Sequence, residues 1–159
     1  MIKLISIKNF YLFIAILSII TLISAIYIEY VLNAKPCKLC LYQRYPYIVA
    51  IFVSFFGYYK YNNKFILYIL AIVFFVSLII SGYHLGIEKG IFSDFSGCIS
   101  VNTDTLTKED LLSNLNEIPG NCKDVYFTVF GLSLATLNVI ISLIIVVISI
   151  LFIKYEKNR

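Results

Sequence analysis

Four cysteines and one arginine have the residue types and spacing expected for redox chemistry. Cys37 and Cys40 form a Cys-x-x-Cys pair, and Arg44 follows Cys40 by four residues. Cys98 and Cys122 lie in the one long polar stretch of the chain. The thiolate is the reactive form of cysteine, and a helix N-terminus or a nearby cation favours it. Two dithiols, one of them beside a fixed positive charge, therefore indicate thiol–disulfide exchange.

The pairing of the four cysteines is open at the level of sequence. Four cysteines allow three pairings, and the local pairs Cys37–Cys40 and Cys98–Cys122 are the natural choice. The ring closed by the first pair is short, whereas the second bond would contribute about 3–4 kcal/mol in the chain-entropy model. We interpret the first pair as reactive and the second as either reactive or structural. An inter-loop bond such as Cys37–Cys98 is a further alternative.

Other polar residues near the apolar runs fit structural or interfacial roles as well as functional ones. Zinc sites usually combine two close ligand pairs, and because Cys98 and Cys122 are far apart in sequence, we expect no metal. His84, the only histidine, fits an interfacial residue as well as a proton carrier, and Glu88 could pair with it. Glu29 is expected to be interfacial only, and Arg44 taken alone fits a membrane anchor.

The elements that must position these residues are membrane spans. Hydrophobic residues make up 60% of the 159 residues, whereas they make up about 45–50% of a soluble domain. The mean hydropathy is +0.90. Crossing the hydrocarbon takes about 20 apolar residues. Four segments qualify, at about 10–28, 41–59, 65–83 and 125–153. The sequence therefore predicts an all-α membrane protein, in which one domain forms a bundle of four transmembrane helices.

The distribution of basic residues predicts the orientation of the spans. Seven basic residues crowd into short segments on one side, and six are spread over two longer loops on the other. By the positive-inside rule, both termini are cytoplasmic, and the cysteine-bearing loops 29–40 and 86–124 are exported. Within the second loop, residues 107–110 predict the start of a short surface helix that ends at Pro119 and Gly120. The net charge of +4 forms no basic stripe, which argues against nucleic-acid binding.

Pro46 limits where the second span can begin. Proline is tolerated only in the first turn of a helix, so the helix starts at about 43–45 or breaks there. Cys40 and Arg44 share a face only if helical structure runs through residues 41–43. Residues 45–59 alone would cover about 22 Å of a core that is roughly 30 Å thick. We therefore expect Cys40 at headgroup depth, where a lipid-soluble acceptor can reach it.

These motifs resemble those of a known family. The segment Cys37-Lys-Leu-Cys40-Leu-Tyr-Gln43-Arg44 closely resembles the signature of the disulfide bond formation protein B (DsbB) family. Supporting matches are Tyr83-His84-Leu-Gly86-Ile-Glu88, Pro119-Gly-Asn-Cys122, Phe130-Gly131-Leu-Ser133 and Asn138. The resemblance covers the whole chain, with four spans in the same order. The chain departs from the family in lacking tryptophan, since Phe127 and Leu137 stand nearest the positions where members often carry it.

The resemblance implies a quinone-dependent thiol oxidase in the bacterial inner membrane, with its cysteines on the periplasmic side. Such an enzyme reoxidises a periplasmic thioredoxin-fold donor (DsbA-like) and passes the electrons to ubiquinone or menaquinone. Cys98 would form the mixed disulfide with the partner, and Cys122 would be its mate in the water-facing half of the relay. Electrons would pass to Cys37 and Cys40. The cofactor-binding residues implied by the resemblance are Cys40, Arg44 and His84.

Two alternatives belong to different classes. A vitamin K epoxide reductase-like protein is also a four-helix redox protein with Cys-x-x-Cys, but its motif sits late in the chain, whereas here it precedes the second span. A non-enzymatic membrane protein with two structural disulfides would instead show bridges that resist mild reduction.

Overall fold

The computed structural model describes residues 7–60, 64–93, 122–123, 127–129 and 131–157. Its elements are α1 (Ile7–Tyr30), α2 (Lys38–Tyr42), α3 (Arg44–Tyr59), α4 (Lys64–Glu88), β1 (Thr128–Val129), β2 (Leu132–Ser133) and α6 (Leu134–Lys157). Four helical segments are long and apolar enough to cross a membrane: Ile7–Tyr30, Lys38–Tyr59, Lys64–Glu88 and Leu134–Lys154. The predicted all-α fold with four spans is confirmed. Cys98 and the short surface helix expected near residues 107–120 lie outside the described residues.

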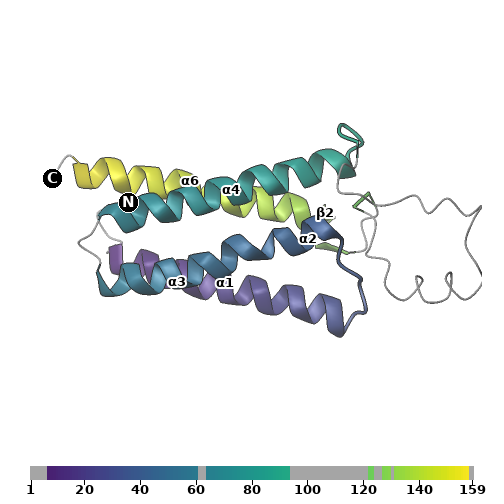
Figure 1. Cartoon of the computed structure of the whole chain (residues 1–159), viewed down its shortest axis with the longest axis horizontal. Helices are drawn as coiled ribbons and strands as arrows, with labels where there is room; N and C mark the ends of the chain where they lie inside the picture. The colour runs from purple at the N-terminus through teal and green to yellow at the C-terminus, as the bar shows by residue number, and fades with distance from the viewer. Residues whose placement is uncertain (1–6, 61–63, 94–121, 124–126, 130, 158–159) are drawn as a thin grey trace, which may run out of the picture.

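The four long helices lie side by side, and the chain reverses direction from one to the next (Figure 1). The start of α1, the end of α3, the start of α4 and the end of α6 share one end of the bundle, while α2 and the strands lie at the other. α1 packs against α3, and α4 packs against α6. Contacts between α3 and α4 hold these two pairs together. In the described residues α1 and α6 touch only slightly, so the bundle is open on that side.

Both the interior and the outer surface of the bundle are apolar. The core includes Tyr11, Ile14, Tyr47, Ala50, Leu67, Leu70, Phe74, Ile145 and Phe152. Large side chains on the outer surface are mostly exposed, as at Phe55, which is 69% accessible. Such a surface suits lipid rather than water as its solvent. Hydrogen bonds also join the helices inside the bundle: Tyr47 donates to Asn138 at 2.5 Å, and Ser142 donates to Ser77 at 3.0 Å, as is typical of membrane helix packing.

The junction between α2 and α3 follows from Pro46. Because α3 begins at Arg44, Pro46 falls in its first turn, where its missing N–H costs no hydrogen bond within α3. Gln43 keeps helical dihedrals (φ −66°, ψ −16°), so the two helices follow one path although the hydrogen-bond ladder is interrupted. The predicted helix start near 43–45 is confirmed. The short α2 before it adds the length that residues 45–59 lack for crossing the hydrocarbon core, so the span is Lys38–Tyr59.

The last turn of α4 is fixed by a glycine. Gly90 adopts a positive φ of 72°, which is strained for other residues. Ile91 then donates its backbone N–H to the carbonyl of Gly86 at 2.8 Å, as in a Schellman motif. This closed turn holds His84 and Glu88 at the end of the bundle that carries α2.

The fourth long helix begins later than the sequence predicts. The expected span covered residues 125–153, but α6 starts at Leu134, and an antiparallel β1–β2 hairpin precedes it. Gly131, with a φ of 77°, turns the chain between the strands. An apolar run does not by itself distinguish a short strand from a helix. The hairpin brings Ser133 to the start of α6 beside the end of α4.

Candidate functional site

A cavity of about 740 Å³ lies at the end of the bundle where α2 and the β1–β2 hairpin are found. Its walls come from α1, the α2–α3 junction, the last turn of α4 and the start of α6. Most of the lining is apolar, and Phe127 and Leu137, which stand nearest the family's tryptophan positions, are part of it. The polar and reactive side chains that line it include Glu29, Cys37, Cys40, Gln43, Arg44, Tyr47, His84, Glu88 and Asn138.

Cys37 and Cys40 are held together by the start of α2. Cys37 is the N-cap residue, and its sulfur accepts a hydrogen bond from the backbone N–H of Cys40 at 3.3 Å. The two sulfurs lie 2.8 Å apart as free thiols. The hydrogen bond with Cys40, together with burial, raises the pKa of the Cys37 thiol to about 12. Cys37 therefore keeps its proton and shares it with Cys40, which is the more exposed of the two.

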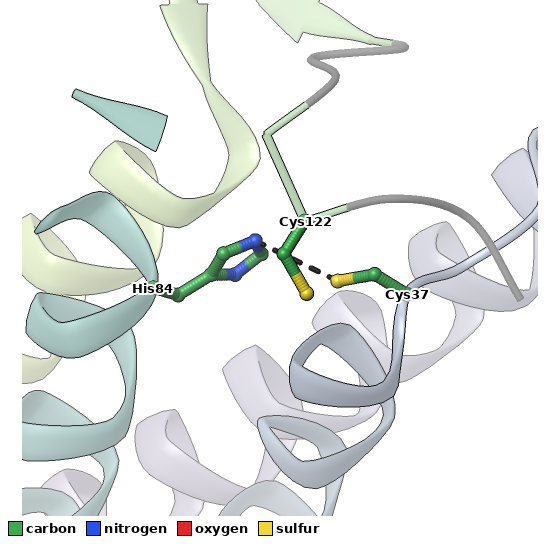
Figure 2. A group of neighbouring side chains, drawn as sticks. All are labelled: Cys37, His84 and Cys122. Atoms are coloured by element: carbon green, nitrogen blue, oxygen red, sulfur yellow. Dashed lines mark hydrogen bonds between the residues drawn. The ribbon is translucent and has the colours of Figure 1, made fainter. Parts of the chain in front are cut away.

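Cys122 lies beside this pair and not in water. Only 1% of the residue is accessible, because it packs with Leu39, Ile87 and Cys37 in a small apolar cluster. Figure 2 shows Cys37, Cys122 and His84 pointing toward one another from three segments of the chain. The two sulfurs and one imidazole nitrogen lie within 4.8 Å of one another. The expectation of a water-facing Cys122 is wrong, since apolar side chains exclude water from its sulfur.

His84 is a buried member of the site, 4% accessible. Its Nε2 lies 3.6 Å from the sulfur of Cys37 and 3.7 Å from Oε1 of Glu88, which confirms the expected pairing with Glu88. Its Nδ1 lies 3.0 Å from the side-chain nitrogen of Gln43. Both ring nitrogens are thus engaged, and the ring orientation is fixed. The purely interfacial interpretation of His84 is wrong.

Ser133 links this wall of the site to α6. Its hydroxyl donates to Oε2 of Glu88 at 2.6 Å and accepts from the backbone N–H of Thr136 at 3.2 Å. The second contact caps the start of α6. The position of Glu88, and through it that of His84, therefore depends on the hairpin before α6.

Arg44 stands on another wall of the cavity and pairs with Glu29 of α1. Arg44 Nη1 lies 2.6 Å from Glu29 Oε2, and the two side chains are 22% and 23% exposed. The sequence predicts an interfacial position for Glu29 but not its ion pair with Arg44. Its only signal was a lone carboxylate at the end of a membrane span, a placement that is costly and commonly functional. Cys40 and Arg44 both line the cavity, as their predicted roles require.

A comparison with protein families gives one match that covers most of the chain. The family described as Disulfide bond formation protein DsbB matches residues 7–152. No curated protein sequence matches the chain. The matched range includes every residue of the site, from Glu29 to Asn138.

Proposed function

The chain belongs to the DsbB family of membrane disulfide oxidoreductases, which work with DsbA, and we propose how its own residues carry out that work. The protein reoxidises a DsbA-like thioredoxin-fold partner in the bacterial periplasm and passes the electrons to a membrane quinone. It lies in the inner membrane, with both termini in the cytoplasm and its cysteines on the periplasmic side. A four-span bundle with its free thiols at one end supports this arrangement.

One observation carries the proposal: a row of sulfurs runs from Cys122 through Cys37 to Cys40 and ends at the cavity. The sulfurs of Cys122 and Cys37 lie within 4.8 Å of each other, and those of Cys37 and Cys40 lie 2.8 Å apart. Disulfide exchange proceeds by attack of a thiolate on a disulfide sulfur. Each exchange along this row therefore needs only a small movement.

The proposed relay begins when the reduced partner attacks Cys98 of a Cys98–Cys122 disulfide, and Cys122 leaves as a thiolate. Cys122 then attacks Cys37 of a Cys37–Cys40 disulfide, and Cys40 leaves as a thiolate at the cavity. The partner's second thiol releases Cys98, which attacks Cys122 and frees Cys37. The partner ends as a disulfide, the Cys98–Cys122 bond is restored, and two electrons and two protons have moved to Cys37 and Cys40.

The cavity beside Cys40 suits a quinone headgroup. Arg44 presents guanidinium N–H groups and a positive charge, and the apolar walls suit a lipid-soluble ring. Bound there, a quinone would accept two electrons and two protons and leave as the quinol. Arg44 also stabilises the thiolate of Cys40 while the proton on Cys37 is held close by. Ubiquinone and menaquinone both offer two carbonyl oxygens, so these groups fit either.

A single-turnover reaction tests the electron-accepting half. A Cys98→Ser/Cys122→Ser variant keeps only the Cys37–Cys40 pair, and after reduction it is mixed with a short-chain ubiquinone in detergent. One quinol per chain and a new Cys37–Cys40 disulfide are expected. The same variant with Cys40→Ser added is the matched control and should form no quinol. Equal quinol formation with the control would refute the assignment of Cys40.

Trapping tests the partner-facing half. In a Cys122→Ala variant Cys98 has no loop partner, so its thiolate attacks the disulfide of the oxidised partner, and a mixed disulfide should accumulate in cells. Peptide mapping should place that bond on Cys98, and a Cys98→Ala/Cys122→Ala variant should trap nothing. A bond mapped to Cys37 would overturn the proposed order of the relay.

A further inference from the structure

The cluster shown in Figure 2 has the composition of a metal site. Two sulfurs and an imidazole nitrogen come from three segments of chain and lie within 4.8 Å of one another, all in buried residues. Zinc–sulfur and zinc–nitrogen bonds of about 2.3 and 2.0–2.1 Å place two ligand atoms of a tetrahedral site roughly 3.5–3.8 Å apart. Cys37 Sγ and His84 Nε2 are already 3.6 Å apart. Sequence spacing argued against zinc only because it assumed that the ligands would come from two close pairs.

Gln43 can hold His84 in the tautomer that a metal requires. Its amide nitrogen lies 3.0 Å from Nδ1 of His84. Turning the amide over places its oxygen at that point instead, where it accepts a hydrogen bond from a protonated Nδ1. Nε2 then turns its lone pair toward Cys37 and Cys122. Metal-binding histidines generally donate their other ring N–H to such an acceptor.

Cys40 can supply the fourth ligand. Cys40 is not one of the three ligands that the fold already gathers. Its sulfur lies 2.8 Å from that of Cys37, so the two sulfurs must separate by about 1 Å for both to bind zinc. Cys-x-x-Cys is a usual chelating pair for this ion. Both cysteines line the cavity of about 740 Å³, as does His84, so an ion has a route to the site. Three thiolates and a neutral imidazole complete a closed tetrahedral set.

We propose that the fully reduced protein binds one Zn²⁺ through Cys37, Cys40, Cys122 and His84, and that the ion holds it out of the catalytic cycle. Binding forms three zinc–sulfur bonds and one zinc–nitrogen bond and releases three protons from the thiols. No electrons move, because zinc is redox-inert. A disulfide at any of these sulfurs removes a ligand, so the site exists only in the reduced state. The regulatory part rests on the proposed function, since the ligands are the sulfurs of the proposed relay.

Thiol protection in the full-length wild-type protein is the first test. The protein is purified in detergent, reduced with a phosphine, freed of reductant, and treated with a maleimide with or without Zn²⁺. Mapping by mass spectrometry should show alkylation of Cys37, Cys40 and Cys122 slowed at least about tenfold by zinc, with Cys98 unaffected. Mg²⁺ is the control ion, since it prefers oxygen ligands. Unchanged rates with zinc, or equal protection of Cys98, would overturn the proposal.

Co²⁺ gives a second measurement that needs no alkylation. The reduced protein should show thiolate-to-cobalt charge-transfer bands and intense tetrahedral d–d bands, and Zn²⁺ should abolish them. The oxidised protein should show neither. Weak octahedral bands in the reduced protein would contradict a thiolate site.

A matched pair of variants then identifies the ligands. Cys122→Ser should weaken zinc affinity, measured by competition with a chelating indicator, by at least roughly tenfold. Cys98→Ser removes the other cysteine of the second pair and should bind zinc as the wild type does. Equal affinity in the two variants would exclude Cys122.

These results separate the metal site from the proposed function. Zinc binding needs neither quinone nor partner, and quinol formation needs no zinc. A protein that forms quinol but binds no zinc would refute only the metal site. A protein that binds zinc but forms no quinol would refute only the proposed function.

Discussion

The two walls of the cavity hold their charged residues in different ways. On the wall formed by α1 and α3, Arg44 and Glu29 pair between helices, and both remain more than a fifth exposed. On the wall formed by α4 and α6, the side chains of His84 and Glu88 are only 5% and 8% exposed and share one helix. A permanent cation such as arginine can remain partly exposed to solvent, whereas buried titratable groups need close hydrogen-bond partners. We infer that the first wall supplies constant charge and the second positions the thiols and their protons.

Removing the constant charge should have the largest effect on activity. Arg44→Gln removes the guanidinium that lines the same cavity as Cys40, and we expect kcat/KM for quinone to fall roughly 100-fold. The KM for the reduced partner should not change. Steady-state assays that vary each substrate separately measure both. Lys38→Gln, which removes an exposed charge nearby, should leave both constants as in the wild type, and an equal loss there would reduce the role of Arg44 to bulk electrostatics.

A change on the buried wall should have a smaller effect and act on a different step. Glu88→Gln keeps an acceptor for Ser133 but removes the anion 3.7 Å from Nε2 of His84. We expect exchange between Cys122 and Cys37 to slow roughly tenfold, as measured by acid-quenched trapping of the Cys37–Cys122 disulfide. Single-turnover quinol formation by the reduced Cys37–Cys40 pair should change less. If quinol formation falls as far as exchange, the division between the two walls is wrong.

Glu29 tests how much the partner of Arg44 matters. Glu29→Gln keeps an oxygen for the guanidinium and removes only the charge of a partly exposed pair. Such pairs contribute about 0–1 kcal/mol, so we expect a change of at most roughly fivefold in the KM for quinone. Glu29→Ala removes the oxygen too and should lie between this variant and Arg44→Gln. A loss with Glu29→Gln as large as that with Arg44→Gln would show that the carboxylate itself takes part in the reaction.

A substitution at Gly57 tests the packing of α1 against α3 without changing any residue that lines the cavity. A Cβ atom at Gly57 would lie 2.6 Å from the Tyr11 ring, whereas one at Gly82 would meet nothing within 4 Å. Gly57→Ala should therefore destabilise the protein by about 1–3 kcal/mol, and Gly82→Ala should stabilise it by up to about 1 kcal/mol. Thermal unfolding in detergent measures both. Single-turnover quinol formation should be unchanged in each, since neither glycine lines the cavity.

The membrane fold could be predicted from the sequence because span length and apolar composition are local properties. The Cys-x-x-Cys pair, Arg44 and the break near Pro46 also follow from neighbours in sequence. The hairpin before α6 was missed because β1 and β2 are two residues each and lie within an apolar run.

The pairings across the site could not be predicted in this way. Glu29 and Arg44 come from different helices, and Glu88 and Ser133 come from a helix and a strand. Cys122 lies beside Cys37 because it packs against Leu39 and Ile87, which come from two other elements. None of these contacts leaves a periodic pattern, since each depends on how separate elements pack.

The junction at Gln43 has a mechanical consequence. α2 is only five residues long, and Pro46 deletes one of the backbone hydrogen bonds that would make it continuous with α3. The two sulfurs of the Cys-x-x-Cys pair thus sit on a short arm with a compliant joint at its base, while Arg44 stays on the rigid helix beyond. A change in sulfur separation as bonds form and break can be absorbed by a small swivel of the arm. Such a swivel would leave the transmembrane part of α3 in place.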